Sequence, residues 1–590
     1  DGHGRNVAIG LDALKIQNAG ADAYNVAIGY QSGAAVSTGT KNTLIGGFAG
    51  DAITTGEYNV ALGQNALSAE DTGSRNVAIG FEALRDLNYD GTGYNIAIGW
   101  QAGLSVSTGI YNTLIGGQAG DALTTGNNNV AIGLFSLSAE TQGDRNVAIG
   151  NSALAAQNNT SDVDSNNVAI GYFALSTEDG HGRNVAIGNE ALKLQNAGSN
   201  AYNVAVGYQA GLNVLTGTQN TIIGSLAGDA LTTGSYNTTM GYLALSAEDT
   251  GNRSTAIGYE SLAAQNYDGD TFNTAVGMWS GKLLTTARYT TALGYQALGG
   301  NTLTGDHNVA IGYQAGQNIT SGYENALIGS YAGDALTTGV RNVAIGLNAL
   351  GAEDEHGGNI AIGHNSLGSQ NAGANAYNVA VGFDAGKSVT TGTENTIIGG
   401  LAGDALNTGV QNVAVGYEAL STEDAHGRNV SIGFQTLKVQ DAGADAYNTA
   451  IGWQAGLSVS TGVQNIILGA LAGDALTTGS YNVAIGVSAL STEDGHGTNV
   501  AIGHQAGVSV STGIKNTIIG AFAGDALTTG SDNVAIGYLA LTSEDGHGRN
   551  VAIGKEALNS QNAGSDAYNV AMGYQAGLNV STGVRNTIVG

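Results

Sequence analysis

The sequence predicts an all-β protein, a parallel β-solenoid of about 34 short coils. A five-residue motif, first present as Asn6-Val7-Ala8-Ile9-Gly10, returns 34 times, with Asn first in 32 copies and Gly last in all 34. Of the 33 gaps between copies, 24 are 17 residues long and seven are 19. A repeat this short and regular is typical of stacked coils, each of which contacts only its neighbours.

Each motif copy has the alternation of a short strand. In an extended chain, Val26 and Ile28 share one face while Asn25, Ala27 and Gly29 share the other. We expect the Val/Ile face to line the interior of the coil and the flat Ala/Gly face to admit another backbone. Neither face is polar, so the pattern predicts burial on both sides.

The first and last positions of the motif predict a structural ladder. Asn tolerates turn geometry, and its amide can bond to the Asn of the coil above or below. We therefore interpret these positions as corners of the coil and not as ligand sites. The first complete set comprises Asn25, Asn42, Asn59 and Asn76, with Gly29, Gly46, Gly63 and Gly80.

A coil of this length has room for a second, weaker strand. We expect it around residues 36–38 in one coil and 53–55 in the next, with Gly39 and Gly56 turning the chain back. A single coil buries too little apolar surface to fold alone. Because the Ala/Gly face is still apolar, the pattern predicts a homotrimer, and at ~4.8 Å per coil the rod would be roughly 160 Å long.

Composition narrows the class of protein. The chain has 590 residues, 95 of them Gly, with no Pro, no Cys and a formal net charge of −28. The absence of Cys excludes disulfides and cysteine metal sites. With only 19 Lys and Arg in total, nucleic acid and anionic membrane are not expected partners. No signal peptide or membrane-spanning run is present in the sequence.

The repeat also predicts the domain organisation. No linker interrupts the period, so residues 1–590 are predicted to form one continuous β-solenoid of 17–19-residue coils. Four coil types, first present in the coils that begin at Asn6, Asn25, Asn42 and Asn59, follow one another in that order in a super-repeat of about 70 residues. Because both ends of the sequence cut through coils, we expect it to be a piece of a longer protein.

One run of the repeat carries a family resemblance. The segment Asn167-Val168-Ala169-Ile170-Gly171-Tyr172-Phe173-Ala174-Leu175 resembles the head repeats of YadA-type trimeric autotransporter adhesins and similar repeats in phage and viral tail fibres. The resemblance implies a left-handed β-roll with three chains around one axis. The coils here are longer than is usual in that family, so a bacterial adhesin, a virion fibre and a free extracellular filament remain open.

Two sets of residues are candidate metal ligands. Turns of sequence Glu-Asp-Gly-His-Gly place a carboxylate beside an imidazole, although their spacing matches no zinc motif and we favour a solvated turn. Their ligand candidates are Asp179, His181, Asp494, His496, Asp545 and His547. A recurring Asp could bind Ca²⁺, but its copies lie mostly four coils apart and a turn role is favoured. These are Asp51, Asp121, Asp229, Asp334, Asp404, Asp474 and Asp525. No cofactor is expected, with Ca²⁺ the alternative.

Aromatic residues follow the motif in one coil type, at Tyr30, Trp100, Tyr208 and Trp453. They either pack against a neighbouring chain, which we favour, or stack on sugars. Nothing breaks the repeat to build a pocket with converging catalytic groups, so an enzyme is not expected.

The sequence therefore predicts a structural protein, the shaft of an extracellular, cell-surface or virion fibre that supplies reach and attachment. Its expected partner is itself, as a homotrimer or a filament, with no membrane insertion in this segment. Two alternatives remain open. One is an adhesin whose β-roll binds matrix or host-surface glycan directly, and the other is an extracellular filament that polymerises end to end.

Overall fold

The computed structural model describes residues 4–159, 164–494 and 497–590 and comprises two compact units, Asp1–Tyr295 and Gln296–Gly590. The described residues form 34 strands and no helix, and each strand consists of the three middle residues of one motif copy. The predicted all-β class and the parallel β-solenoid are confirmed.

The strands of the first unit are β1 (Val7–Ile9), β2 (Val26–Ile28), β3 (Thr43–Ile45), β4 (Val60–Leu62), β5 (Val77–Ile79), β6 (Ile96–Ile98), β7 (Thr113–Ile115), β8 (Val130–Ile132), β9 (Val147–Ile149), β10 (Val168–Ile170), β11 (Val185–Ile187), β12 (Val204–Val206), β13 (Thr221–Ile223), β14 (Thr238–Met240), β15 (Thr255–Ile257), β16 (Thr274–Val276) and β17 (Thr291–Leu293). Those of the second unit are β18 (Val309–Ile311), β19 (Ala326–Ile328), β20 (Val343–Ile345), β21 (Ile360–Ile362), β22 (Val379–Val381), β23 (Thr396–Ile398), β24 (Val413–Val415), β25 (Val430–Ile432), β26 (Thr449–Ile451), β27 (Ile466–Leu468), β28 (Val483–Ile485), β29 (Val500–Ile502), β30 (Thr517–Ile519), β31 (Val534–Ile536), β32 (Val551–Ile553), β33 (Val570–Met572) and β34 (Thr587–Val589).

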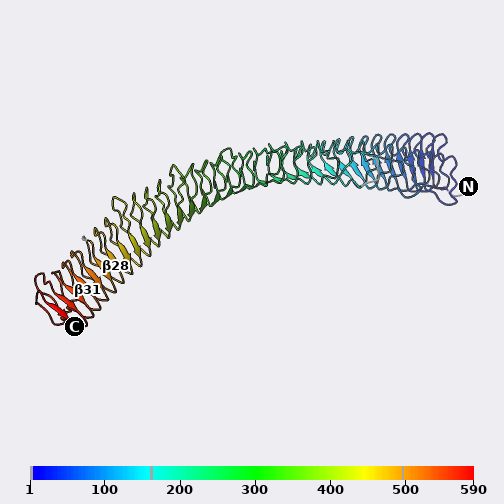
Figure 1. Ribbon diagram of the computed structural model, residues 1–590. Coiled ribbons are helices and arrows are strands. Elements are labelled where there is room, and N and C mark those ends of the chain that lie inside the picture. Colours follow the sequence, from blue (N-terminus) through cyan, green and yellow to red (C-terminus); the bar gives the residue numbers. More distant parts are fainter. Residues whose placement is uncertain (1–3, 160–163, 495–496) are drawn as a thin grey trace. The chain divides into compact units, whose positions relative to one another are not determined.

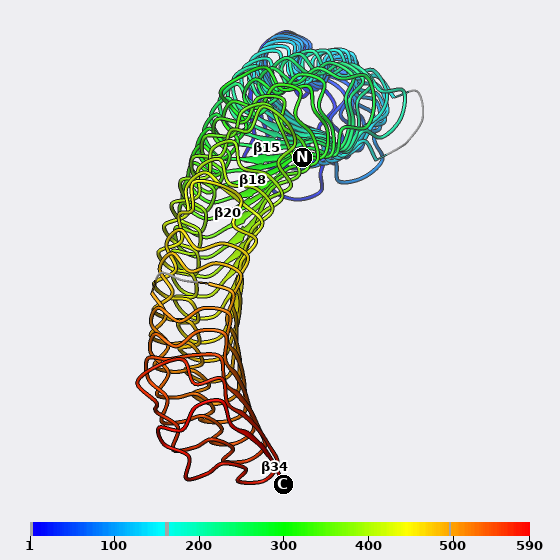
Figure 2. The same cartoon turned by 60° about the vertical axis from the view of Figure 1, so that its left-hand side comes forward.

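Within each unit, every strand pairs in parallel with the next strand along the chain, at the same motif position. In the pair β2 and β3, Val26 lies opposite Thr43, Ala27 opposite Leu44, and Ile28 opposite Ile45. Figure 1 shows the strands as successive rungs, and Figure 2 shows that the ribbon turns once for each strand. At ~4.8 Å per strand, the 17 strands of one unit make a stack about 80 Å long.

The two faces of the strands lie opposite to the expectation. Asn25 and Ala27 are fully buried inside the coil, whereas Val26 and Ile28 point outward and are half-buried. The prediction that the Val/Ile face lines the interior and the Ala/Gly face is free for another chain is wrong. The interior is narrow and also holds side chains such as Val36, so most strands place a small residue, usually Ala, there.

Packing inside the coils gives a physical reason for the four-coil super-repeat. In the third coil type the middle strand residue is large, as at Leu44, which is fully buried. A Cβ at Gly33 would lie 2.6 Å from Leu44 Cδ1, and one at Gly50 would lie 2.8 Å from Leu44 Cδ2. In the fourth coil type, the position equivalent to Gly33 and Gly50 is occupied by Leu67, which is fully buried. Glycine in two coils therefore makes the space that a strand leucine fills.

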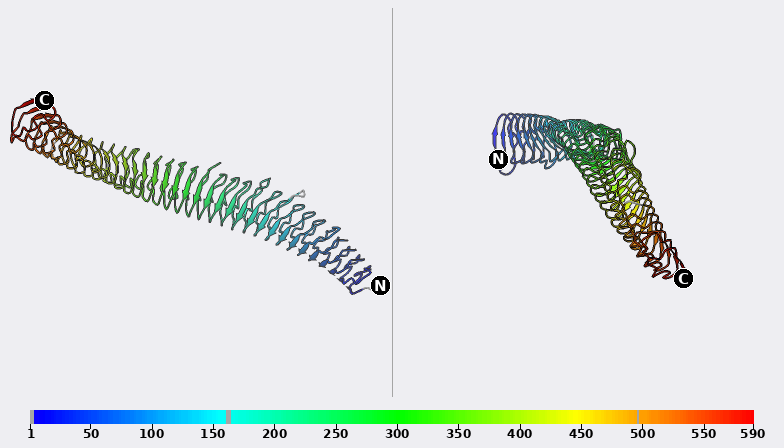
Figure 3. Two further views of the ribbon diagram at one scale, coloured as in Figure 1. Left: turned by 90° about the horizontal axis from the view of Figure 1, so that it is seen from below. Right: turned by 90° about the vertical axis from the view of Figure 1, so that its left-hand side faces the viewer.

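The second strand expected in each coil does not form. In Figure 3 the arrows lie along one side of each coil. Residues 37–38 and 54–55 are bends, and Val36 and Ile53 belong to no strand. The backbone N–H groups of Ser37 and Gly39 both donate to the carbonyl of Thr54, at 2.9 and 3.2 Å. Because two donors converge on one acceptor, successive coils are linked there without the even ladder of a parallel sheet.

Candidate functional site

The motif asparagines form a hydrogen-bonded column inside each unit, interrupted in the first unit at Ser254, whose hydroxyl bonds to that of Thr271 instead. The side-chain Oδ1 of Asn25 accepts from the backbone N–H of Asn42 at 2.8 Å, and Oδ1 of Asn42 accepts from the N–H of Asn59 at 2.9 Å. In most coils Nδ2 donates across its own coil, as from Asn42 to the carbonyl of Gly56 at 2.8 Å. Among the described residues, Nδ2 has no hydrogen-bond partner in Asn76, Asn146, Asn359 and Asn429. Asn76 continues the column by accepting from the N–H of Asn95 at 3.1 Å. The amides thus bond mainly to backbone groups, which gives the backbone N–H at the corner of most coils a partner.

The motif glycines have a backbone conformation that other residues adopt only with strain. At Gly29, Gly46, Gly63 and Gly80, φ lies between +140° and +144°. A Cβ at each of these positions would lie 2.6 Å from the carbonyl carbon of the glycine one coil further on. The dihedral angle and the close approach of the next coil each require glycine at this position.

A column of exposed cations and aromatic rings lies immediately before the motif asparagines. The Arg75 guanidinium is 5.4 Å from the ring of Tyr58 and 5.7 Å from that of Tyr94. On one side Lys41 lies 4.5 Å from the Tyr58 ring, and on the other Tyr94 stacks on Tyr111 at 5.7 Å. Five successive coils are thereby joined by cation–π and stacking contacts.

The sequence analysis did not identify this column, which we call the Lys41–Tyr111 column. A second one comprises Tyr236, Arg253, Phe272 and Tyr289, in which Arg253 lies 5.4 and 5.5 Å from the two flanking rings. The signal in the sequence is the recurrence of Lys, Arg or Tyr just before the motif. It predicts contacts between these side chains only once the register of the coils is known.

The aromatic residues that follow the motif also lie on the outer side of the sheet. Tyr30, Trp100, Tyr208 and Trp453 have exposed fractions between 48% and 51%. Some of them contact rings of adjacent coils, since Tyr30 packs edge-on against Phe48 at 5.2 Å and Trp453 stacks on Phe434 at 6.5 Å. About half of each of these residues remains exposed.

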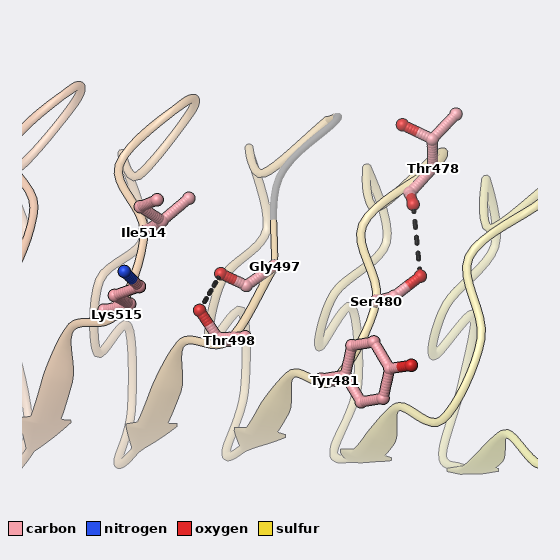
Figure 4. Close-up of a pocket in the computed structure, with 7 residues that line it drawn as sticks. All are labelled: Thr478, Ser480, Tyr481, Gly497, Thr498, Ile514 and Lys515. Carbon is pink, nitrogen blue, oxygen red and sulfur yellow. Dashed lines mark hydrogen bonds between the residues drawn. The ribbon is translucent and has the colours of Figure 1, made fainter.

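In the second unit, a shallow hollow of about 370 Å³ lies among residues that immediately precede the motif asparagines. Its floor carries Tyr481, Thr498 and Lys515 from three successive coils (Figure 4). The Thr498 hydroxyl donates to the carbonyl of Gly497 at 2.6 Å, so it turns back onto its own chain. The hollow exists because the short Thr498 lies between the longer Tyr481 and Lys515 of the neighbouring coils, and the described residues that line it include no Asp, Glu or His.

The recurring aspartates of the third coil type lie singly along each unit. In all seven, one carboxylate oxygen, Oδ1, is buried and has no hydrogen-bond partner in the part of the chain that the structure describes. Burial raises the pKa of every one of these carboxyl groups. The structure does not bring two of them together, so no multidentate calcium site of the kind that Ca²⁺ prefers is formed by this set among the described residues.

The turns that contain Glu, Asp and His bring their polar side chains together. Ligand atoms of Glu178, Asp179 and His181 all lie within 4.8 Å of one another, as do those of Glu544, Asp545 and His547. The third predicted turn contains Asp494 and His496, and His496 lies outside the described residues.

Two further turns of this kind were missed by the sequence analysis. Glu353, Asp354 and His356 form one cluster, and Glu423, Asp424 and His426 form the other, joined by Asp441 from the next coil. They were missed because the residue before His is Glu355 or Ala425 and not Gly. The pattern Glu-Asp-x-His would have found them.

The glutamates of the fourth coil type are buried. Glu70 is fully buried, and its Oε1 accepts from the backbone N–H of Gly73 at 2.6 Å. Burial raises the pKa of Glu70 to about 7, and it has the same effect on Glu178, Glu353, Glu423 and Glu544. The hydrogen bond from Gly73 opposes the shift but does not cancel it.

This shift predicts that the coil at Glu70 is more stable in mild acid than in mild base. A carboxyl with a pKa of 4.5 unfolded and about 7 folded binds its proton more tightly in the folded state, so stability falls as pH rises from about 4.5 to 7 and then levels off. The loss should be on the order of 2–3 kcal/mol. Hydrogen exchange of peptides around residues 60–80 at pH 5.5 and 8, corrected for intrinsic exchange rates, measures it.

The neutral isostere Glu70→Gln keeps the acceptor for Gly73 and removes the titration. It should make the local stability nearly independent of pH, whereas Glu57→Gln, at a half-buried position, should leave the pH dependence unchanged. An unchanged pH dependence in Glu70→Gln would contradict this assignment.

Comparison with known families and with curated proteins gives no significant match. A search of the described residues for a helix long and apolar enough to cross a lipid bilayer found none.

Proposed function

We propose that the chain is a structural protein, the shaft of an extracellular or virion fibre, in which three copies pack together along their sheets. The observation that carries this proposal is the outer face of the sheet. Strand after strand places two side chains on this face, the first aliphatic or Thr and the second aliphatic. Both are only half-buried, as at Val26 and Ile28 in β2 and at Thr43 and Ile45 in β3.

A second copy of the same chain is the partner that fits this face best. The face repeats at ~4.8 Å along each unit, and only another stack of the same spacing matches it without a change of register. It is apolar and bordered by aromatic residues such as Tyr24 and Tyr30, which are exposed to 46% and 48%. An uncovered apolar face of this extent is unusual for a monomer in water.

The resemblance of the motif to YadA-type heads and tail fibres supports a threefold arrangement and a location outside the cell or on a virion. The trimer argument now rests on the Val/Ile face, since the Ala/Gly face is inside the coil. In such a fibre the role of the chain is reach and rigidity, and attachment gains from many copies acting together.

Light scattering of the purified chain tests the proposal, with negative-stain microscopy for particle length. We expect a mass near three chains and a particle roughly 160 Å long at ~4.8 Å per coil. A single-chain mass would refute the trimer, and an open-ended distribution of masses would favour the filament.

An interface variant tests which face is used. Ile328, Ile398 and Ile451 are exposed to between 37% and 39% in the single chain, so changing all three to Lys should spare the coil. It should convert the trimer into single chains with an unchanged circular dichroism spectrum, because the interface would bury nine cations. The matched control changes Ala374, Ala444 and Ser565, which are exposed on loops outside the strands, to Lys and should remain trimeric.

An adhesin whose β-roll binds glycan or matrix directly is a second candidate, favoured by the Lys41–Tyr111 column. Exposed rings and cations in one line are suited to stack on sugars and to bind acidic groups. Binding to a glycan array, measured for the native chain and for Tyr58→Ala with Tyr94→Ala, separates the two functions. The shaft proposal expects no binding that depends on these two rings.

A further inference from the structure

Four turns of the chain repeat one arrangement of Glu, Asp and His, with a different residue before His in several of them. They span Glu178–His181, Glu353–His356, Glu423–His426 and Glu544–His547. In each, the backbone N–H of the His donates to Oε1 of the Glu, at 3.1 or 3.2 Å. The backbone therefore holds a buried carboxylate and an imidazole side by side, whatever residue separates them.

Several buried side-chain atoms of these turns have no hydrogen-bond partner among the described residues. The imidazole Nδ1 is buried and unpartnered in His181, His356, His426 and His547. In Glu353 and Glu423, which are fully buried, the second carboxylate oxygen, Oε2, is also unpartnered. Buried polar atoms are rarely left without a partner, and here the same atoms are left so in one turn after another.

The distance between these groups suits a shared metal ion better than a hydrogen bond. Nδ1 of the His lies 3.8 Å from Oε1 of the Glu in the turns of Glu353, Glu423 and Glu544. That is too long for a hydrogen bond. Two ligands of a tetrahedral Zn²⁺, each at about 2.0–2.1 Å from the metal, are about 3.4 Å apart, so a small movement of the imidazole brings both into range.

The turn at Glu423 adds a ligand that the others lack. Asp441, from the following coil, offers a carboxylate oxygen within 4.8 Å of those of Glu423 and Asp424 and of the His426 imidazole. In the turn of Glu178, by contrast, Oε2 accepts from Nδ2 of Asn184 at 3.3 Å. The Glu423 turn thus has four ligand groups and a free buried oxygen.

We propose that Glu423, Asp424, His426 and Asp441 bind a divalent transition-metal ion of the Zn²⁺ class. One imidazole and three carboxylates match the mixed nitrogen and oxygen ligands that Zn²⁺ accepts, whereas Ca²⁺ takes six to eight oxygens. The ion joins two successive coils, because Asp441 lies one coil beyond the other three ligands. The other three turns, with three ligand groups each, are weaker sites of the same kind.

Isothermal titration of the full chain with ZnCl₂, after treatment with a chelator, tests the proposal. One site should bind Zn²⁺ more tightly than the rest, and excess CaCl₂ should not displace it. Co²⁺ in place of Zn²⁺ should give the intense visible absorption of a four-coordinate ion. Asp441→Asn, at an exposed position, should weaken the tight site at least tenfold, and His426→Ala should abolish it.

The turn at Glu70 supplies the matched control. It has Gly73 where the four turns have His, and its Glu70 is equally buried, so Glu70→Gln should leave Zn²⁺ binding unchanged. Circular dichroism of each variant checks that the coils are intact. The proposal is overturned if folded Asp441→Asn and His426→Ala bind Zn²⁺ as the native chain does, if Ca²⁺ competes equally, or if no site binds.

Discussion

Replacing Gly399 with alanine is expected to destabilise the coils around β23 by roughly 3–5 kcal/mol. The φ of Gly399 is +136°, and a Cβ there would lie 2.6 Å from the carbonyl carbon of Gly416 in the next coil. Neither the backbone dihedral nor the stacking distance can relax without opening the ladder between β23 and β24. Hydrogen exchange of peptides spanning residues 390–420, read by mass spectrometry, measures the local loss.

The neighbouring glycine is the control for this experiment. Gly400 has no left-handed φ, and a Cβ there would lie 3.5 Å from the Tyr417 ring and 4.0 Å from the carbonyl oxygen of Phe383, which are ordinary contacts. Gly400→Ala should therefore leave exchange in residues 390–420 within about 0.5 kcal/mol of the native value. Equal effects of the two substitutions would show that the close approach between coils does not determine the glycine.

Replacing Asn112 with alanine should be the next most damaging change, with a loss of roughly 2–5 kcal/mol in the adjoining coils. Asn112 is fully buried. Its Oδ1 accepts from the N–H of Asn129 at 2.9 Å, and its Nδ2 donates to the carbonyl of Gly126 at 2.8 Å. Alanine leaves both backbone groups buried without a partner.

Protection of the Asn129 amide against hydrogen exchange reports this loss directly. The control is Asn189→Ala, since Asn189 is exposed just after the strand of its coil, and it should change stability by less than about 0.5 kcal/mol. If the Asn129 amide stays protected in Asn112→Ala, the column of asparagines is not what holds the coil corners.

Much of the fold could be predicted because the repeat fixes the register. When Asn25 and Asn42 occupy the same place in successive coils, the residues between them must pair as Val26 does with Thr43. The candidate metal site was harder to predict, because Glu423 and Asp441 belong to successive coils and come together only when the coils stack. The sequence analysis looked for Gly before His and so identified three turns of this kind, without those at Glu353 and Glu423.

The second strand was predicted from the wrong signal. Val36 and Ile53 are β-branched residues beside Ser and Thr, a pattern typical of strands. Both are fully buried, but the neighbouring N–H groups converge on single acceptors such as the Thr54 carbonyl. The coil is too short to hold two extended segments and its turns, so the burial was predicted correctly and the hydrogen bonding was not.

By itself, the sequence determined the fold class, the positions of the strands, their register and the need for glycine at the end of each motif. These depend on spacing and on backbone geometry, which are local. Only the tertiary structure decided which face of the strand is inside. Alternation defines two faces, but the volume left by side chains such as Val36, and the hydrogen bond of each Asn across its coil, place Ala inside and leave Val and Ile on the surface.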